Sequence, residues 1–303
     1  MNANVIPGIS KGVDRFDRPG PIAFIAWMVA LALVVWSFSG ADLSIEKLVR
    51  GVPYMGNILE RMFPPDLSRL ESILASLAVT FQMAVSGCIL GLVLSFPLAI
   101  LAADGLSPHP LVRAATRGLI AFFRTVPDLV WALFFVIAVG LGPAAGVLAL
   151  MVDTIGYAGR FFAEAMEETD KGPREALSTI GATRTGLVFS AVVPNAMPSF
   201  IATALFCLEK ATRASVVLGL VGAGGIGVEL KVAFDLFDYD TAATIIIVVF
   251  ILVVAVEQIG AYLRRRILLT RRTAVRLRGA HRSPASPDTR PDPTAWEPMR
   301  CQS

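Results

Sequence analysis

The chain has 303 residues, of which 55% are hydrophobic and 17% are charged, and its mean hydropathy is +0.66. Soluble domains carry about 45–50% apolar and about 25% charged residues, so this composition excludes an ordinary soluble protein and predicts an integral membrane protein. The net charge of +3 is less informative than the clustering of charges between long uncharged stretches.

The first apolar run, residues 21–39, follows a polar segment at 1–20. About 18 apolar residues are near the lower limit for a spanning helix, and such a run is also compatible with a signal peptide. Two tryptophans in the run and the lack of an A-x-A-like exit favour a retained helix. Basic residues ahead of the run place the N-terminus in the cytoplasm.

A connector at residues 40–70 mixes acidic, basic and proline residues, and we interpret it as extracytoplasmic and partly amphipathic. The second span is expected at about 73–103, with a kink at Pro97. The polar turn after this span is followed by arginines, so it lies in the cytoplasm again. These arginines are Arg113, Arg117 and Arg124.

Four further spans are expected at about 119–139, 147–162, 187–208 and 241–262. A Gly- and Pro-rich turn joins the first two of them. Acidic residues precede the last span and arginines follow it, which places the C-terminus in the cytoplasm, in agreement with an even number of spans. The tail at 268–303 is expected to be basic at first and then disordered.

A charged stretch at residues 164–185 interrupts this pattern and is cytoplasmic in the predicted topology. Its acidic residues lead to Gly172 and Pro173, where a short helix is expected to begin. Gly181 is expected to break this helix, and a second helix is expected to begin near Thr183. Composition alone favours an ordinary solvated loop.

The spacing of residues changes that interpretation. Glu175, Ala176 and Leu177, then three residues and Gly181, then a longer gap and Pro194, resemble the EAA loop of ABC importer permeases. Leu177 is an apolar departure from the usual pattern. In that family the loop is the coupling helix, which inserts into a groove of the cytoplasmic ATPase and carries its closure into the membrane. We call residues 164–194 the coupling segment.

The resemblance covers residues 71–267 and narrows to the permeases of phosphonate-type importers, which include transporters of phosphite and related phosphorus oxyanions. Segments 124–150, 164–177 and 217–227 carry it. It implies an all-α polytopic membrane protein with about six transmembrane helices, a cytoplasmic coupling helix and the ABC importer permease fold. A permease for another small solute of the same importer class is the alternative.

The resemblance also implies partners. They are a second copy of the chain, two ATP-binding subunits that use ATP and Mg, and an extracytoplasmic binding protein, at a bacterial inner membrane with both termini cytoplasmic. The chain has no G-x-x-x-x-G-K-[ST] loop, so we expect a non-enzymatic subunit that binds no cofactor. The arginine-rich ends are read as topology anchors and not as a nucleic-acid site.

Charged residues near the outer end of the fifth predicted span are candidates for the substrate path. Lys210 and Arg213 are suited to attract an incoming oxyanion. Arg213 is equally suited to pair with Glu209 at i,i+4, and for Glu209 we favour this structural role. Arg124 and Asp128 are also four residues apart and predict a structural pair or an inner gate.

Four glycines, Gly222, Gly224, Gly225 and Gly227, form a G-x-G-x-x-G motif after the strand-like stretch 215–221. A dinucleotide site needs a βαβ unit and an acidic residue about 20 positions onward, whereas an apolar span follows here, so we reject that reading. Either a flexible segment at the outer mouth of the pathway or close helix packing explains the glycines.

The sequence disfavours three other functions: ion-coupled transport, catalysis within the membrane and metal binding. An ion-coupled secondary transporter needs midplane carboxylates and inverted repeats, and residues 73–208 carry almost no such acid. A membrane-embedded enzyme needs paired carboxylates or histidine clusters in the spans, and we expect no catalytic residue. Cys88 and Cys207 lie in apolar segments, Cys301 lies in the tail, and the two histidines lie in polar stretches, so no metal site is expected.

Overall fold

The computed structural model describes residues 20–40 and 44–280, with side chains described as far as Arg266. All regular elements in these ranges are helical, which confirms the predicted all-α class. The chain forms two units, Met1–Arg61 and Met62–Ser303. The polar segment at 1–19 and the predicted disordered tail from 281 lie outside the described residues, as does His281.

The described residues of the first unit, 20–40 and 44–61, form two helices. The first, α1 (Pro21–Gly40), carries no charged residue and is long and apolar enough to cross a membrane, as expected for a retained span. The second, α2 (Ile45–Arg61), lies in the predicted connector and begins with an ion pair between Glu46 and Arg50 at 2.5 Å.

Two long helices form the centre of the second unit. They are α3 (Leu70–Ala102), which contains Pro97, and α6 (Pro143–Glu167). A Cβ on Gly87 would lie 2.6 Å from Leu150 Cβ, and a Cβ on Gly91 would lie 2.5 Å from Thr154 Cβ. The two helices therefore run side by side in the same direction, at a separation that glycine alone permits. Such small residues are typical of membrane helix interfaces, because close packing replaces the hydrophobic effect there.

The span predicted at 119–139 is not a single straight helix. The chain forms α4 (Pro110–Thr125) and α5 (Asp128–Val139), which meet at an angle of 89°. Pro127 has no N–H for the helical ladder and disfavours helical geometry in the residue before it, so Val126 is extended with ψ of 123°. Five other described helices are long and apolar enough to cross a membrane, and this bent pair gives a sixth if it is one span.

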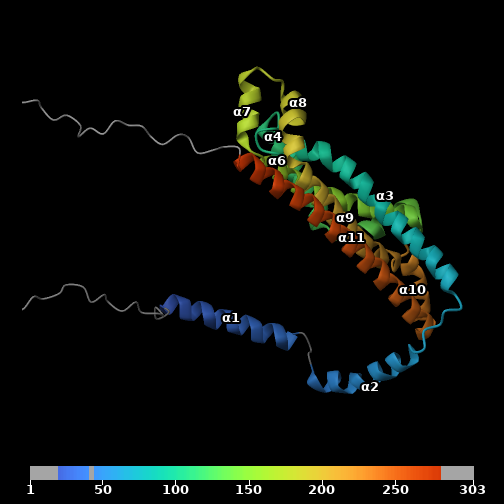
Figure 1. Cartoon of the computed structure of the whole chain (residues 1–303). Coiled ribbons are helices and arrows are strands. Elements are labelled where there is room, and N and C mark those ends of the chain that lie inside the picture. The colour runs from blue at the N-terminus through green and yellow to red at the C-terminus, as the bar shows by residue number, and fades with distance from the viewer. Residues whose placement is uncertain (1–19, 41–43, 281–303) are drawn as a thin grey trace, which may run out of the picture. The chain divides into compact units, whose positions relative to one another are not determined.

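The coupling segment forms a helix, a turn and a second helix. The first helix is α7 (Lys171–Thr179), and the second is α8 (Arg184–Leu187). Gly181 has φ of +79° between them, and the Thr183 hydroxyl accepts a hydrogen bond from the Gly186 N–H at 3.2 Å. The predicted break and restart are therefore confirmed. Figure 1 shows α7 and α8 together at one end of the second unit.

A π-helical turn, η1 (Val188–Val192), leads from α8 into α9 (Val193–Gly219). The Val193 N–H bonds to the Val188 carbonyl, five residues earlier, and Pro194 follows directly. Because proline lacks the donor that continues an i→i−4 ladder, a wider turn fits this place. The coupling segment is thus continuous with a membrane helix through an irregular turn.

The glycine motif lies at the opposite end of the unit, before α10 (Ile226–Asp235) and α11 (Tyr239–Ala280) (Figure 1). The strand-like reading of 215–221 is wrong, since α9 continues to Gly219. Gly222, Gly224 and Gly225 all have positive φ. A Cβ on Gly225 would lie 2.3 Å from the Thr80 hydroxyl, which accepts a 2.7 Å hydrogen bond from the Ile226 N–H.

Gly227 makes the closest approach at this end of the unit. A Cβ there would lie 2.1 Å from the Val216 carbonyl oxygen and 2.7 Å from the Cα of Gly219. The start of α10 therefore packs directly on the end of α9. Of the two explanations for the motif, close helix packing agrees with this geometry.

Gly227→Ala is therefore expected to destabilise the protein by about 1–3 kcal/mol, the usual cost of overpacking. The measurement is the thermal unfolding midpoint of the purified chain in detergent. Gly118→Ala is the control, because nothing lies within 4 Å of a Cβ at that position of α4. An unchanged midpoint for Gly227→Ala would show that α9 and α10 separate without cost.

Candidate functional site

The exposed surface of the coupling segment is formed by α7 and the turn after it. Asp170 caps α7 by accepting a hydrogen bond from the Gly172 N–H at 3.1 Å. Glu175 and Ala176 are exposed, and Leu177 is half-buried. The Glu175 carboxylate has no partner among the described residues, so its charge is available to a molecule that docks on this face.

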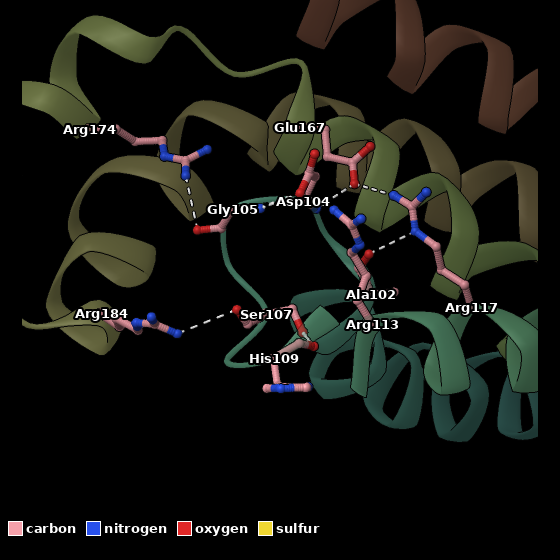
Figure 2. A network of polar contacts seen from close by, with 10 residues as sticks. All are labelled: Ala102, Asp104, Gly105, Ser107, His109, Arg113, Arg117, Glu167, Arg174 and Arg184. Carbon is pink, nitrogen blue, oxygen red and sulfur yellow. Dashed lines mark hydrogen bonds and ion pairs between the residues drawn. The ribbon is translucent and has the colours of Figure 1, made fainter. Parts of the chain in front are cut away.

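Two arginines hold the coupling segment against the loop between α3 and α4 (Figure 2). Arg174 of α7 donates to the Gly105 carbonyl at 3.2 Å, and Arg184 at the start of α8 donates to the Ser107 carbonyl at 3.4 Å. Hydrogen bonds from a charged donor are stronger than neutral ones. Both helices of the segment are therefore attached to the same loop.

The loop itself is attached to α6 and α4 by a second group of contacts (Figure 2). Glu167 at the end of α6 accepts a hydrogen bond from the Asp104 N–H at 2.6 Å and pairs with Arg117. Arg117 also donates to the Ala102 carbonyl at 2.9 Å, and Arg113 pairs with Asp104. Sequence analysis used these arginines for topology alone and did not predict the cluster.

An ion pair inside the membrane-spanning part joins α6 to α9. Lys210 donates to both oxygens of Asp153 at 2.6 and 2.7 Å, and the Asp153 side chain is only 9% exposed. The ammonium also lies 3.5 Å from the centroid of the Tyr157 ring. A buried charge is costly unless it is paired, so these contacts account for both residues.

The position expected for Lys210 is therefore corrected. It does not lie at the outer end of its span, because α9 continues to Gly219 and the partner aspartate lies in the interior of α6. Asp153 was missed because a single acid in an apolar stretch gives no spacing signal. Its presence also shows that residues 73–208 do contain a carboxylate within a span.

A second buried carboxylate joins α9 to α11. Glu209 accepts from Arg213 at 3.2 Å and from Arg264 at 3.1 Å. The i,i+4 pair considered from the sequence is thus present, with a partner that sequence analysis had assigned to topology. The Arg213 side chain is 48% exposed, so it remains accessible to solvent although it pairs with Glu209.

Arg124 and Asp128 do not form an ion pair in the described part of the chain. The break at Val126 and Pro127 lies between them, so the i,i+4 geometry of a continuous helix is lost. The Arg124 guanidinium lies 5.2 Å from the centroid of the Tyr157 ring, on which Lys210 also stacks. Within the described residues, no group of three or more His, Cys, Asp or Glu side chains is placed to hold a metal ion.

The chain is similar to known membrane transport proteins. Residues 95–269 match the family described as binding-protein-dependent transport system inner membrane component. The chain is 37% identical over 254 residues to the phosphite transport system permease protein PtxC of Stutzerimonas stutzeri, covering 84% of this chain and 91% of that protein. It is 39% identical to the phosphate-import permease protein PhnE of Mycolicibacterium smegmatis, covering 78% of this chain and 42% of that protein.

A solved structure of the MetNI methionine ABC transporter, in inward-facing conformations, has a chain of the same fold. Its TM-score is 0.57 at 23% identity, and the match covers 67% of this chain and 99% of that one. This similarity shows the fold and carries no information on substrate.

The buried ion pair predicts a specific pattern of stabilities. Asp153→Asn and Lys210→Gln are each expected to destabilise the protein by about 3–5 kcal/mol, because each leaves one charge in the span without its partner. The double variant is expected to be closer to the original protein than either single variant. Thermal unfolding in detergent measures all three.

Arg213→Gln serves as the control for this pattern. Its expected cost is about 1 kcal/mol or less, because the Arg213 side chain is half exposed and Arg264 still pairs with Glu209. If the double variant lost the sum of the two single costs, the two residues would not be coupled as the structure indicates.

Proposed function

The chain belongs to the binding-protein-dependent transport system inner membrane component family, and we propose that its cargo is a phosphorus oxyanion, such as a phosphonate, phosphite or phosphate. The observation that carries the proposal is the identity of 37% over 91% of the phosphite permease PtxC, joined by similarity to the phosphate-import permease PhnE. The chain is a membrane-spanning subunit of an ABC importer.

Two ATP-binding subunits are proposed to dock on the coupling segments of two membrane subunits, one on each. The exposed and unpaired Glu175, the small Ala176 beside it and the open turn at Gly181 support this assignment, since nothing within the described chain covers them. Leu177, next to them in α7, is half-buried. Closure of the ATP-binding subunits on binding ATP would displace α7, and ATP hydrolysis would return α7 to its starting position.

Two routes lead from α7 into the membrane. One runs through Arg174 and Arg184 to the loop between α3 and α4, and from there to α6 through Glu167. The other runs along α8 and the π-helical turn before Pro194 into α9. A displacement of α7 would therefore reach several membrane helices together.

A second copy of the chain is proposed to complete the pathway. Both copies are proposed to lie in a bacterial inner membrane, with their N- and C-termini on the cytoplasmic side. Arg124 of α4 and Arg160 of α6 are exposed in the single chain. Charges on membrane-spanning helices usually face a partner or a water-filled path, so a second membrane subunit is proposed to enclose such a path on this side. An extracytoplasmic binding protein is proposed to deliver the substrate.

Removal of the Glu175 charge tests the docking assignment. Glu175→Ala is expected to reduce substrate uptake by at least about tenfold, because loss of a charged interface contact costs about 2–5 kcal/mol. Gly181→Val is expected to have a similar effect for a different reason, since the φ of +79° at this turn is strained for a β-branched residue. The ATP-binding subunit should no longer co-purify, while membrane insertion stays unchanged. Glu168→Gln, which removes an exposed charge just before α7, is the matched control.

Uptake that persists in both variants, together with normal co-purification, would assign the docking surface elsewhere. Loss of uptake in the Glu168→Gln control would mean that any change of charge at this face disturbs the protein.

Growth on a single phosphorus source tests the cargo. A strain that lacks this gene is expected to grow on neither phosphite nor methylphosphonate when that compound is the sole phosphorus source, and the gene on a plasmid is expected to restore growth. The same strain should grow normally on an organic phosphate ester that another route supplies. Unimpaired growth on both test compounds would indicate a different solute of the same importer class.

A further inference from the structure

An open cavity of about 640 Å³ lies between α4 and α6, at the end of the unit that carries the coupling segment. The ends of α3 and α6 contribute Ala102 and Glu167 to its wall. Its charged lining consists of three arginines and two glutamates. They are Arg117, Arg124, Arg160, Glu164 and Glu167.

The arginines differ in how they are neutralised. Arg160 pairs with Glu164 at 2.7 Å, and Arg117 pairs with Glu167. Arg124 has no carboxylate partner among the described residues, and the described contact of its guanidinium is with the Tyr157 ring. The cavity therefore carries one uncompensated positive charge, with two paired guanidinium groups in the same wall.

Arg124 is held in a defined place. A Cβ on Gly156 would lie 2.8 Å from the Arg124 backbone nitrogen, so α4 rests directly on α6 at this residue. The guanidinium stacks on Tyr157, and the Lys210 ammonium on the same ring is neutralised by Asp153. Both the backbone and the side chain of Arg124 are thus positioned before any ligand arrives.

The location also connects the cavity to the coupling segment. Arg124 lies in the last turn of α4, just before the 89° bend into α5. Arg113 and Arg117, nearer the start of α4, belong to the cluster that holds the loop under α7 and α8. A displacement of the coupling segment would therefore move the helix that carries Arg124.

We propose that this cavity is a transit site for a tetrahedral phosphorus oxyanion, with Arg124 as the residue that binds it. This inference rests on the proposed function. A guanidinium group can donate to two oxygens of such an anion, and Arg117 or Arg160 supplies a further contact by exchanging its glutamate partner. The cavity is larger than the ion, so water remains around it and binding is weak, as passage requires.

The phosphate of an anionic phospholipid presents the same chemistry, so the test must separate the free ion from the lipid. Ala121 lines the cavity on the same helix and is exposed, which makes Ala121→Cys a reporter of the local charge. The background is Cys301→Ser, because Cys88 and Cys207 are buried. Gly118→Cys, on α4 but not in the cavity wall, is the control reporter.

The first measurement is the ratio of labelling rates with anionic and cationic methanethiosulfonate reagents, with the chain in phosphatidylcholine vesicles. At Ala121→Cys the anionic reagent is expected to react faster. Arg124→Gln is expected to lower the ratio by roughly three- to tenfold, the effect of one charge a few ångströms away in a partly wet site. At Gly118→Cys the change is expected to be less than about twofold.

The second measurement is protection. Phosphite and methylphosphonate are expected to slow labelling of Ala121→Cys, and Arg124→Gln is expected to abolish this protection while Arg124→Lys keeps part of it. An unchanged ratio in Arg124→Gln, or equal protection without Arg124, would overturn the proposal. Protection that appears only when phosphatidylglycerol is added, with no effect of the free ions, would assign the cavity to lipid and overturn it too.

Transport separates this proposal from the proposed function. The assembled importer with Arg124→Gln is expected to take up phosphite at least about fivefold more slowly than the original, with co-purification of its ATP-binding subunits unchanged. If the original importer takes up phosphite and Arg124→Gln does so equally well, the transit site is wrong and the function stands. If the original importer takes up no phosphorus oxyanion, the proposed function itself fails.

Discussion

The arrangement of helices at the coupling-segment end of the second unit depends on the contacts of the Glu167 carboxylate. One of its oxygens accepts a hydrogen bond from the Asp104 backbone at 2.6 Å, and the same oxygen pairs with Arg117. This single acid therefore joins the end of α6 to the loop after α3 and to α4. Because Arg174 and Arg184 attach α7 and α8 to that loop, the exposed face of the coupling segment is supported by the membrane helices beneath it.

The charges within the spans follow a common rule, since each buried carboxylate is used to join helices. Asp153 joins α6 to α9 through Lys210, and Glu209 joins α9 to α11 through Arg264. An unpaired charge is costly in a low-dielectric environment. These two ion pairs therefore favour one position of α9 relative to α6 and α11. Arg124 departs from the rule, because its described contact is an aromatic ring and not a carboxylate.

Glycine and proline occur where helices must approach closely or turn. Gly227 allows α10 to contact the end of α9, and Gly156 allows α4 to contact α6 at Arg124. Proline marks the two sites where a membrane helix is interrupted, at Pro127 between α4 and α5 and at Pro194 after the π-helical turn. The first interruption lies directly after Arg124, and the second joins the coupling segment to α9.

The membrane class, most of the spans, and the helix, turn and helix of the coupling segment could be predicted from the sequence. These depend on local composition and spacing, as the match of Gly181 and Thr183 to the observed turn illustrates. Which charged residues pair with one another could be learned from the fold alone. Lys210 pairs with Asp153, 57 positions away in the sequence, and Arg264 pairs with Glu209, 55 positions away. No local sequence pattern predicts pairing over such separations. The sequence placed Arg124 and Asp128 one helical turn apart, but the fold bends the chain between them, because Pro127 interrupts the helix that this spacing presumes.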